Sequence, residues 1–203
     1  LKNCPEIHLR IIQLHKRRKL RKFYKIIKRI KKENKLFNKI FFYTETDFYR
    51  EKIFKDIGIN CELFYNNTPL YKRKVKDKII FNVGFLGESR QDKGFDKIPD
   101  ILNYFILKKN SKVNFYIQLH KVPLNLNSIK NEIYNLANKY KNIHIIEGYV
   151  DFDDYNNLLK KIDIVPLLHT EEQIKHNGSK IVFETIANEI LMVINLNAKY
   201  VKN

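Results

Sequence analysis

The sequence predicts an α/β fold: a doubly wound parallel sheet, preceded by a basic N-terminal helix. Two observations predict the sheet. From residue 78 onward, short apolar stretches alternate with stretches of helical length, and some apolar stretches, such as 164–168, are continuous. Strands that alternate with helices form parallel sheets, and continuous apolar strands are typical of a sheet covered on both faces. A third observation, the clustering of Lys and Arg near the N-terminus, predicts the basic helix.

The N-terminal part, residues 1–77, is predicted to contain the basic helix, the tail of an N-terminal domain and a linker. Residues 9–37 have apolar side chains at spacings close to 3.6, which indicates an amphipathic helix. A strand is expected at 39–46 and another at 61–65, with a helix between them that Asp47 caps and Gly58 ends. Residues 66–77 have turn residues and charges without periodicity, which is typical of a linker.

Residues 78–203 are predicted to form one Rossmann-like domain. The expected strands are 78–87, 112–120, 142–148, 162–168 and 191–195. The expected helices are 95–109, 127–140, 151–161 and 180–188. Ligands of such sheets bind at the carboxyl ends of the strands, which here means the loops 87–94, 120–126, 148–151 and 168–180.

The charge of the chain is concentrated in one segment. The 203 residues include 39 basic and 22 acidic ones, a net charge of +17, and residues 10–39 alone hold fourteen basic residues and one acid, Glu33. Three interpretations of this segment stay open. It is a packing helix with solvated cations, exaggerated by a compositional preference for Lys, or it binds anionic lipid, or it binds nucleic acid. No other nucleic-acid-binding motif accompanies the third interpretation.

Several classes of protein are excluded by composition. Two cysteines, Cys4 and Cys61, are too few for a disulfide framework or a metal site, so we expect a reducing, cytoplasmic environment. No apolar run approaches the roughly 18–20 residues that span a bilayer, and no secretory signal pattern is present. The sequence does not begin with Met, and we expect it to be part of a longer chain.

The first candidate site is the loop that follows the strand at 78–87. It contains Gly87, Arg90, Lys93 and Gly94 immediately before a predicted helix. Free N–H groups at a helix start together with two cations would bind a diphosphate. The glycine spacing matches neither the P-loop nor the dinucleotide-binding pattern. An ordinary turn with surface charges is the alternative.

The second candidate site is the loop that precedes the helix at 180–188. It contains Asn177, Gly178, Ser179 and Lys180, and Glu184 follows one turn later. Asn and Ser favour a helix start, and glycine allows a ligand to approach the backbone. The helix N–H groups would bind an anion, and Glu184 would accept hydrogen bonds from sugar or ribose hydroxyls. A polar loop with a solvated Glu184 is the alternative.

Two further residues follow strands at the same edge of the sheet. His120 ends one predicted strand, and Tyr149 follows the next one along the chain. Tyr149 would stack on a nucleotide base, while His120 would lie at the ligand edge. Ordinary packing of the tyrosine and a plain loop histidine are the alternatives.

Four motifs occur in an order that resembles a known family. They are a glycine and a basic residue followed by Lys-Gly, a loose V-x-G-x-V pattern, an apolar strand that ends in proline, and a Gly/Ser loop before a helix with Glu and Ala. In this sequence they lie at 87–94, 145–150, 162–166 and 178–187. This order resembles the C-terminal nucleotide-binding domain of GT-B glycosyltransferases, especially those of family 4.

The sequence departs from this family pattern at several places. His176 stands where the family has the first Glu of an E-x7-E pattern, and Glu88 stands where it has an Arg. Residues 189–191 replace the family's G-x-P. The chain ends soon after this helix, and most of the N-terminal acceptor domain is absent. The resemblance therefore implies a C-terminally incomplete donor-binding half, with the catalytic residues expected in the missing N-terminal domain.

The resemblance implies transfer of a sugar from a UDP- or GDP-linked donor to a glycan or a lipid-linked acceptor, with retention, as in polysaccharide biosynthesis. It implies no cofactor and no metal, and a cytoplasmic enzyme that is peripheral to the inner face of the plasma membrane. Two alternatives stay open: a non-catalytic nucleotide- or phosphate-binding module, and a protein that binds anionic membranes or nucleic acid through residues 10–39. The residues expected to bind the donor are Arg90, Lys93, Gly94, His120, Tyr149, Asn177, Gly178, Ser179, Lys180 and Glu184.

Overall fold

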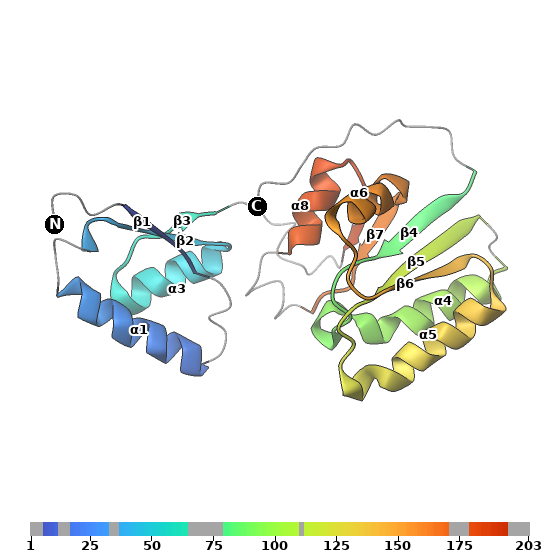
Figure 1. Ribbon diagram of the computed structural model, residues 1–203, viewed down its shortest axis with the longest axis horizontal. Coiled ribbons are helices and arrows are strands. Elements are labelled where there is room, and N and C mark those ends of the chain that lie inside the picture. Colours follow the sequence, from blue (N-terminus) through green and yellow to red (C-terminus); the bar gives the residue numbers. More distant parts are fainter. Residues whose placement is uncertain are drawn as a thin grey trace. The chain divides into compact units, whose positions relative to one another are not determined.

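The computed structural model describes residues 6–11, 17–32, 37–64, 79–109, 112–170 and 179–194. The described residues fall into two compact units, which we call unit 1 (6–64) and unit 2 (79–194) (Figure 1). The predicted domain boundary after residue 77 lies outside the described residues. None of the described helices has both the length and the apolar character needed to cross a membrane.

Unit 1 is built on a three-stranded parallel sheet with the strand order β1-β2-β3. Helices α1 and α3 make the two connections, and both lie on one face of the sheet (Figure 1). Ile27 of α1, Phe42 of β2 and Ile53 of α3 meet in the buried core of this unit. The elements are β1 (Ile7–Ile11), α1 (Arg17–Lys31), β2 (Ile40–Thr44), α3 (Asp47–Ile57) and β3 (Glu62–Leu63).

Helix α3 begins and ends where the sequence predicts, but a different residue caps it. The side chain of Thr46, not that of Asp47, accepts a hydrogen bond from the Tyr49 N–H. Thr46 has an extended backbone, which is the usual conformation of an N-cap residue. Gly58 ends the helix with a φ of 62°, and its N–H donates to the Phe54 carbonyl.

The prediction of one helix over 9–37 is wrong. Residues Ile7–Ile11 form strand β1, and the helix begins only at Arg17. Apolar residues alternate in β1, and the strand pairs along its length with β2, from Ile7 opposite Ile40 onward. The residues in β1 fit a period of two as well as a period of 3.6, and pairing with β2 decides between them.

The basic helix α1 is a packed part of unit 1. Ile27 is buried against the sheet, and the Lys31 ammonium donates to the Ile57 carbonyl at 2.9 Å. The opposite face of the helix carries exposed cations. They are Arg21, Lys22, Lys25, Lys28 and Arg29, and the exposed Lys32 directly follows the helix. The described part of the segment therefore has the arrangement expected of a packing helix with a solvated basic face.

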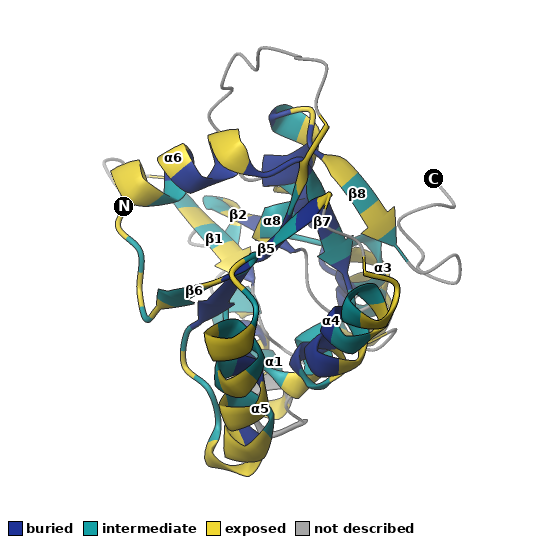
Figure 2. Cartoon of the chain, turned by 90° about the vertical axis from the view of Figure 1, so that its right-hand side faces the viewer, coloured by how far each residue is buried: buried dark blue, intermediate teal, exposed yellow. Residues whose placement is uncertain are grey.

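Unit 2 is built on a five-stranded sheet in which every strand pairs in parallel, with the order β6-β5-β4-β7-β8. The central strands β4, β5 and β7 contain most of the sheet's buried residues, and β5 is buried along most of its length (Figure 2). The strands are β4 (Phe81–Phe85), β5 (Val113–Leu119), β6 (Ile143–Glu147), β7 (Ile164–Leu167) and β8 (Leu191–Ile194).

Helices cover both faces of this sheet, as the sequence predicts. Helices α4 (Ile98–Leu107) and α5 (Asn127–Lys139) lie on one face, while α6 (Phe152–Lys161) and α8 (Lys180–Ala187) lie on the other (Figure 1). The chain winds in one direction from β4 to β6 and in the other from β7 to β8. The winding reverses between the neighbouring strands β4 and β7, and ligands of doubly wound sheets bind at such a point.

Candidate functional site

The turn that follows β4 is held against the segment that follows β7. The turn contains a short 3₁₀ helix, Gln91–Lys93, which Gly94 ends with a φ of 75°. A Cβ atom on Gly94 would lie 2.3 Å from the Cβ and 2.5 Å from the carbonyl oxygen of Leu168. The Thr170 N–H donates to the Asp92 carbonyl at 3.0 Å. Glycine is required at position 94 both by its left-handed backbone and by this close approach.

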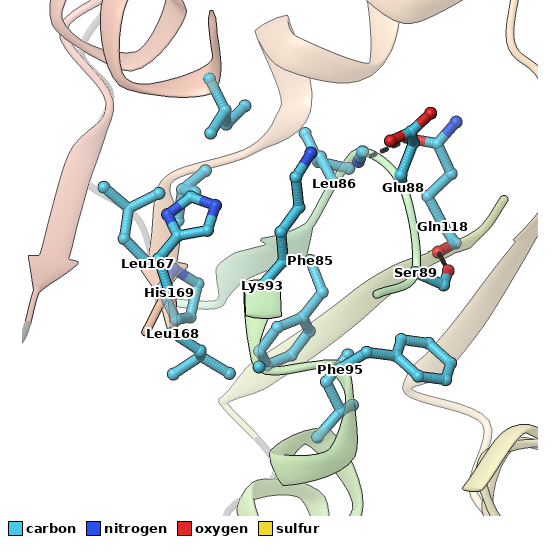
Figure 3. A pocket seen from close by; sticks show the side chains of 16 residues that line it. Phe85, Leu86, Glu88, Ser89, Lys93, Phe95, Gln118, Leu167, Leu168 and His169 are labelled. Carbon is cyan, nitrogen blue, oxygen red and sulfur yellow. Dashed lines mark hydrogen bonds between the residues drawn. The ribbon is translucent and has the colours of Figure 1, made fainter. Parts of the chain in front are cut away.

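A pocket lies between the carboxyl ends of β4 and β7, at the point where the winding reverses (Figure 3). Its volume of about 40 Å³ exceeds the roughly 10–15 Å³ that one water requires. Leu86 and Gly87 follow β4, Leu168 and His169 follow β7, and Ile181 of α8 also lines the pocket. Gln118 of β5 lines it too, so the pocket is assembled from four segments of unit 2 that are distant in sequence.

Lys93 reaches into this pocket from the 3₁₀ helix. Its ammonium lies 3.6 Å from the place that a Cβ of Gly87 would occupy, and Gly87 has a φ of 103°. Burial, and secondly the nearby Arg90 charge, lower the pKa of Lys93. Within the described part of the chain, no carboxylate or carbonyl lies within bonding distance of this ammonium. The pocket thus holds a half-buried cation that is available to an anion.

Arg90, the other cation expected to bind the diphosphate, is already ion-paired. Its Nε lies 2.9 Å from one oxygen of Asp92, and its Nη1 lies 3.2 Å from a carboxylate oxygen of Glu88. Lys121 adds a second ion pair to Glu88 at 2.8 Å. These carboxylates neutralise much of the charge of Arg90, so the structure favours Lys93 over Arg90 as the anion-binding group.

His169 lines the same pocket beside Lys93 (Figure 3). The residue is only 7% exposed, and its Nδ1 has no hydrogen-bond partner among the described residues. Burial, and then the positive charge of Lys93, lower the pKa of His169 to about 4, although Asp92 opposes this. The imidazole is therefore neutral at pH 7.

Gln118 and Ser89, two buried polar residues, fasten the loops around the pocket. The Gln118 side chain accepts from the Gly87 N–H at 2.8 Å and donates to the Gly148 carbonyl at 3.1 Å. The Ser89 hydroxyl donates to the Gln118 carbonyl and accepts from the His120 N–H. These bonds join the turn after β4 to the ends of β5 and β6.

His120 and Tyr149 lie next to each other at the ends of β5 and β6, outside the Lys93 pocket. Their rings meet edge to face at a centroid distance of 6.1 Å, and Tyr149 is 79% exposed. Tyr149 also borders a second, more open hollow of about 500 Å³ that includes Asp151 and Asp154. The exposed ring is free to stack on a planar ligand, as the sequence suggests.

Glu184 is buried and already bonded within the protein. It is 4% exposed, it accepts from the Tyr155 hydroxyl at 2.8 Å, and its other oxygen lies 2.9 Å from the Lys180 ammonium. Burial, and then the Glu184 charge, raise the pKa of Tyr155. The alternative of a solvated Glu184 is wrong. A carboxylate has about four acceptor positions, so this one retains capacity for ligand hydroxyls.

The start of α8 is only partly described. Ser179 is buried at the N-cap position and makes no capping hydrogen bond through its side chain. Asn177 and Gly178, like His176, lie outside the described residues. The predicted anion site at this helix start therefore stays a prediction.

The structure brings Lys93 and Gly94 into one pocket. Two other predicted pairs form separate clusters: His120 lies with Tyr149, and Lys180 lies with Glu184. Three polar residues of this region escaped the sequence analysis: Ser89, Gln118 and His169. Gln118 lies near the end of a mostly apolar strand, and His169 closely follows another. A polar residue in or just after a buried strand is the signal that would have found both.

In the described part of the chain, no group of three or more His, Cys, Asp or Glu residues is placed to hold a metal ion.

No protein-family model matches the sequence, and no curated protein matches it. Solved structures do match the fold. A UDP-forming α,α-trehalose-phosphate synthase from Burkholderia xenovorans has a TM-score of 0.58 and 10% identity, over 98% of this chain and 55% of that chain. Anabaena HepE, solved with UDP and glucose, has a TM-score of 0.53 and 12% identity over 80% of this chain and 46% of that chain. TarM has a TM-score of 0.53 and 15% identity over 76% of this chain and 29% of that chain.

These similar proteins are GT-B glycosyltransferases, and this chain has the fold of part of such a protein. It spans 55%, 46% and 29% of their lengths, respectively. The comparisons do not favour the two alternatives, a non-catalytic nucleotide- or phosphate-binding module and a protein that binds anionic membranes or nucleic acid through residues 10–39. Placement in family 4 stays a prediction.

Proposed function

We propose that this chain is the donor-binding part of a glycosyltransferase and that unit 2 binds a nucleoside diphosphate sugar. The observation that carries the proposal is the pocket between β4 and β7, where a half-buried Lys93 faces a glycine-flanked turn and bonds no carboxylate of the described residues. Its place, where the winding of the sheet reverses, is the usual ligand site of this fold class. The fold similarity to GT-B glycosyltransferases supports the same function.

In this proposal Lys93 binds the diphosphate and stabilises the negative charge that develops on it as the sugar leaves. A half-buried ammonium is effective in this role, because its interaction with an anion is weakly screened by water. Gly87 leaves room above the turn, and Gln118 holds the Gly87 backbone in place. Arg90 is a secondary contributor because Asp92 and Glu88 share its charge.

We assign the remaining contacts of the donor to residues that lie near the carboxyl ends of the unit 2 strands. Glu184 accepts hydrogen bonds from ribose or sugar hydroxyls, and Lys180 and Tyr155 hold its carboxylate in position. Tyr149 stacks on the base beside His120. The base is that of UDP or GDP, and no metal or cofactor takes part. We extend the proposal to hexosyl transfer with retention to a glycan or a lipid-linked acceptor, in polysaccharide biosynthesis.

Calorimetric titration of the 203-residue chain with UDP and GDP tests the donor site. Replacing Lys93 by Ala is expected to weaken binding of the preferred nucleotide at least about tenfold, because a hydrogen bond to a charged group is lost. Lys121→Ala is the matched control, since Lys121 lies nearby but is 66% exposed and paired to Glu88. Failure of the folded wild-type chain to bind either nucleotide, or equal binding by Lys93→Ala, would disprove the proposal.

The cationic face of α1 supports a peripheral membrane location on the cytoplasmic side. Its exposed Lys and Arg residues lie beside Ile26, which is 48% exposed, and an apolar side chain among cations suits a bilayer surface. We expect the chain to sediment with vesicles of phosphatidylglycerol but not with vesicles of phosphatidylcholine. The triple variant Lys22→Glu, Lys25→Glu, Arg29→Glu should no longer sediment with these vesicles. The control variant Lys130→Glu, Lys139→Glu, Lys141→Glu should still do so. Sedimentation that survives the α1 changes would contradict this location.

A further inference from the structure

The candidate is the histidine that lines the Lys93 pocket from the opposite strand. His169 closely follows β7, whereas Lys93 belongs to the turn after β4, and both line the same small pocket (Figure 3). His169 took no part in the sequence-based prediction of the site, and the proposed donor contacts do not require it.

His169 is buried, and one of its polar atoms has an unsatisfied hydrogen-bonding capacity. The residue is 7% exposed and its Nδ1 is without a hydrogen-bond partner among the described residues. Buried polar atoms are almost always bonded, and each exception has a cost in stability. An exception inside a pocket is explained when a ligand supplies the missing partner.

The charge of the pocket indicates the chemistry of that partner. The charged groups that act on His169 are Lys93, Arg90 and Asp92, all from the turn after β4. The walls from β7 and α8 are apolar, with Leu167, Leu168 and Ile181. Glu88, Ser89 and Gln118 also line the pocket, but among the described residues none of them bonds the Lys93 ammonium or the Nδ1 of His169. An anionic oxygen would satisfy both groups.

We infer that His169 is a second anion-binding group, which donates a hydrogen bond from Nδ1 to a phosphate oxygen held by Lys93. The inference rests on the proposed function only in taking this phosphate to be part of the donor's diphosphate. In the free protein burial, and secondly the nearby cation, lower the pKa of the imidazole, whereas a bound phosphate offsets the cation and raises this pKa. Binding is thus accompanied by proton uptake at His169.

The test compares the wild-type 203-residue chain with His169→Leu and His169→Asn. Leu removes the polar atom, and Asn retains a nitrogen near the position of Nδ1. Inorganic pyrophosphate, UDP and GDP are titrated calorimetrically in two buffers of different ionisation enthalpy. His169→Leu should weaken pyrophosphate binding about tenfold and abolish the proton uptake. Asn should restore most of the affinity without the proton uptake.

Thermal unfolding of the free proteins separates ligand binding from packing. Because Leu removes an unsatisfied buried group, His169→Leu should raise the unfolding temperature of the free chain while weakening binding. A lower unfolding temperature together with unchanged pyrophosphate affinity would show that His169 only packs, and would overturn the inference. Unchanged affinity alone would overturn it too.

The outcomes also distinguish this inference from the proposed function. If UDP or GDP binds through Lys93 but His169→Leu binds as the wild type does, the inference fails and the function stands. If pyrophosphate binds through His169 but neither nucleotide binds more tightly than pyrophosphate, the function fails and the inference stands. If none of the three ligands binds the folded chain, both are wrong.

Discussion

The turn after β4 and the start of α8 lie at the same edge of the sheet in unit 2, and their charged groups are satisfied in different ways. Lys93 of the turn lines a pocket together with His169, which follows β7, and neither its ammonium nor the His169 Nδ1 has a bonded partner among the described residues. In α8, Glu184 is bonded to both Tyr155 and Lys180. The first region has polar groups that are available to bond a ligand. In the second region the polar groups already hold one carboxylate in place. Binding energy is therefore expected to come mainly from the turn.

The largest expected effect is on the packing of the turn itself. Gly94→Ala places a Cβ within 2.3 Å of Leu168 in a left-handed backbone conformation. Left-handed strain and overpacking together should destabilise unit 2 by about 2–5 kcal/mol. Hydrogen exchange of the β4 and β5 amides measures this loss.

Gly148→Ala is the matched control for this substitution. Gly148 is also left-handed, with a φ of 66°, but a Cβ there meets nothing within 4 Å. Only the strain should remain, about 1–2 kcal/mol. Equal losses in the two variants would show that contact with the segment after β7 does not stabilise the turn.

The second effect is a dependence of stability on pH that arises from His169. Its folded-state pKa of about 4 lies below its ordinary value, so the unfolded chain binds a proton first as the pH falls. The stability that the neutral, buried His169 allows is fully present above about pH 6.5 and is lost as the pH falls toward 4. The free energy of unfolding should be lower by about 2 kcal/mol at pH 5. Urea unfolding followed by circular dichroism at pH 8 and pH 5 should show this loss in the wild type. His169→Leu should show less of it, and parallel losses would contradict the assignment.

The third effect concerns the bonded carboxylate of α8. Tyr155→Phe removes one of its hydrogen bonds and should lower the free energy of unfolding by about 1 kcal/mol. With the carboxylate less well held, UDP affinity should fall roughly threefold, whereas pyrophosphate affinity, which needs no hydroxyl acceptor, should not change. A change in pyrophosphate affinity would mean that the two regions act as one.

The smallest effect is expected at Lys180. Its side chain is 64% exposed, and it pairs with Glu184 across one helical turn. Only the lysine end of this pair is solvated, but the Tyr155 hydroxyl still bonds the buried carboxylate. Lys180→Ala should therefore lower the free energy of unfolding by only about 0.5 kcal/mol, as is usual for a pair one helical turn apart. A loss as large as that of Tyr155→Phe would show that the ion pair, rather than the tyrosine, holds Glu184.

Much of the fold was predictable because it depends on local patterns. The alternation of apolar and amphipathic stretches located every described strand and α-helix of unit 2 within a few residues, but not the short 3₁₀ helices. Local signals were weaker in unit 1, where five residues of β1 fit both periods and only pairing with β2 made them a strand. The site was predictable where a backbone requirement is encoded by residue type, as at Gly94.

The sequence by itself determined the order of elements, the doubly wound topology and the loops that meet at the ligand edge, because periodicity and glycine placement act over a few residues. Only the tertiary structure decided which polar groups are used and which are left open. It paired Lys121 with Glu88, bonded Glu184 to Tyr155, and set His169 beside Lys93. Such partners come from distant segments, and burial and charge pairing depend on distances in space that residue spacing does not contain.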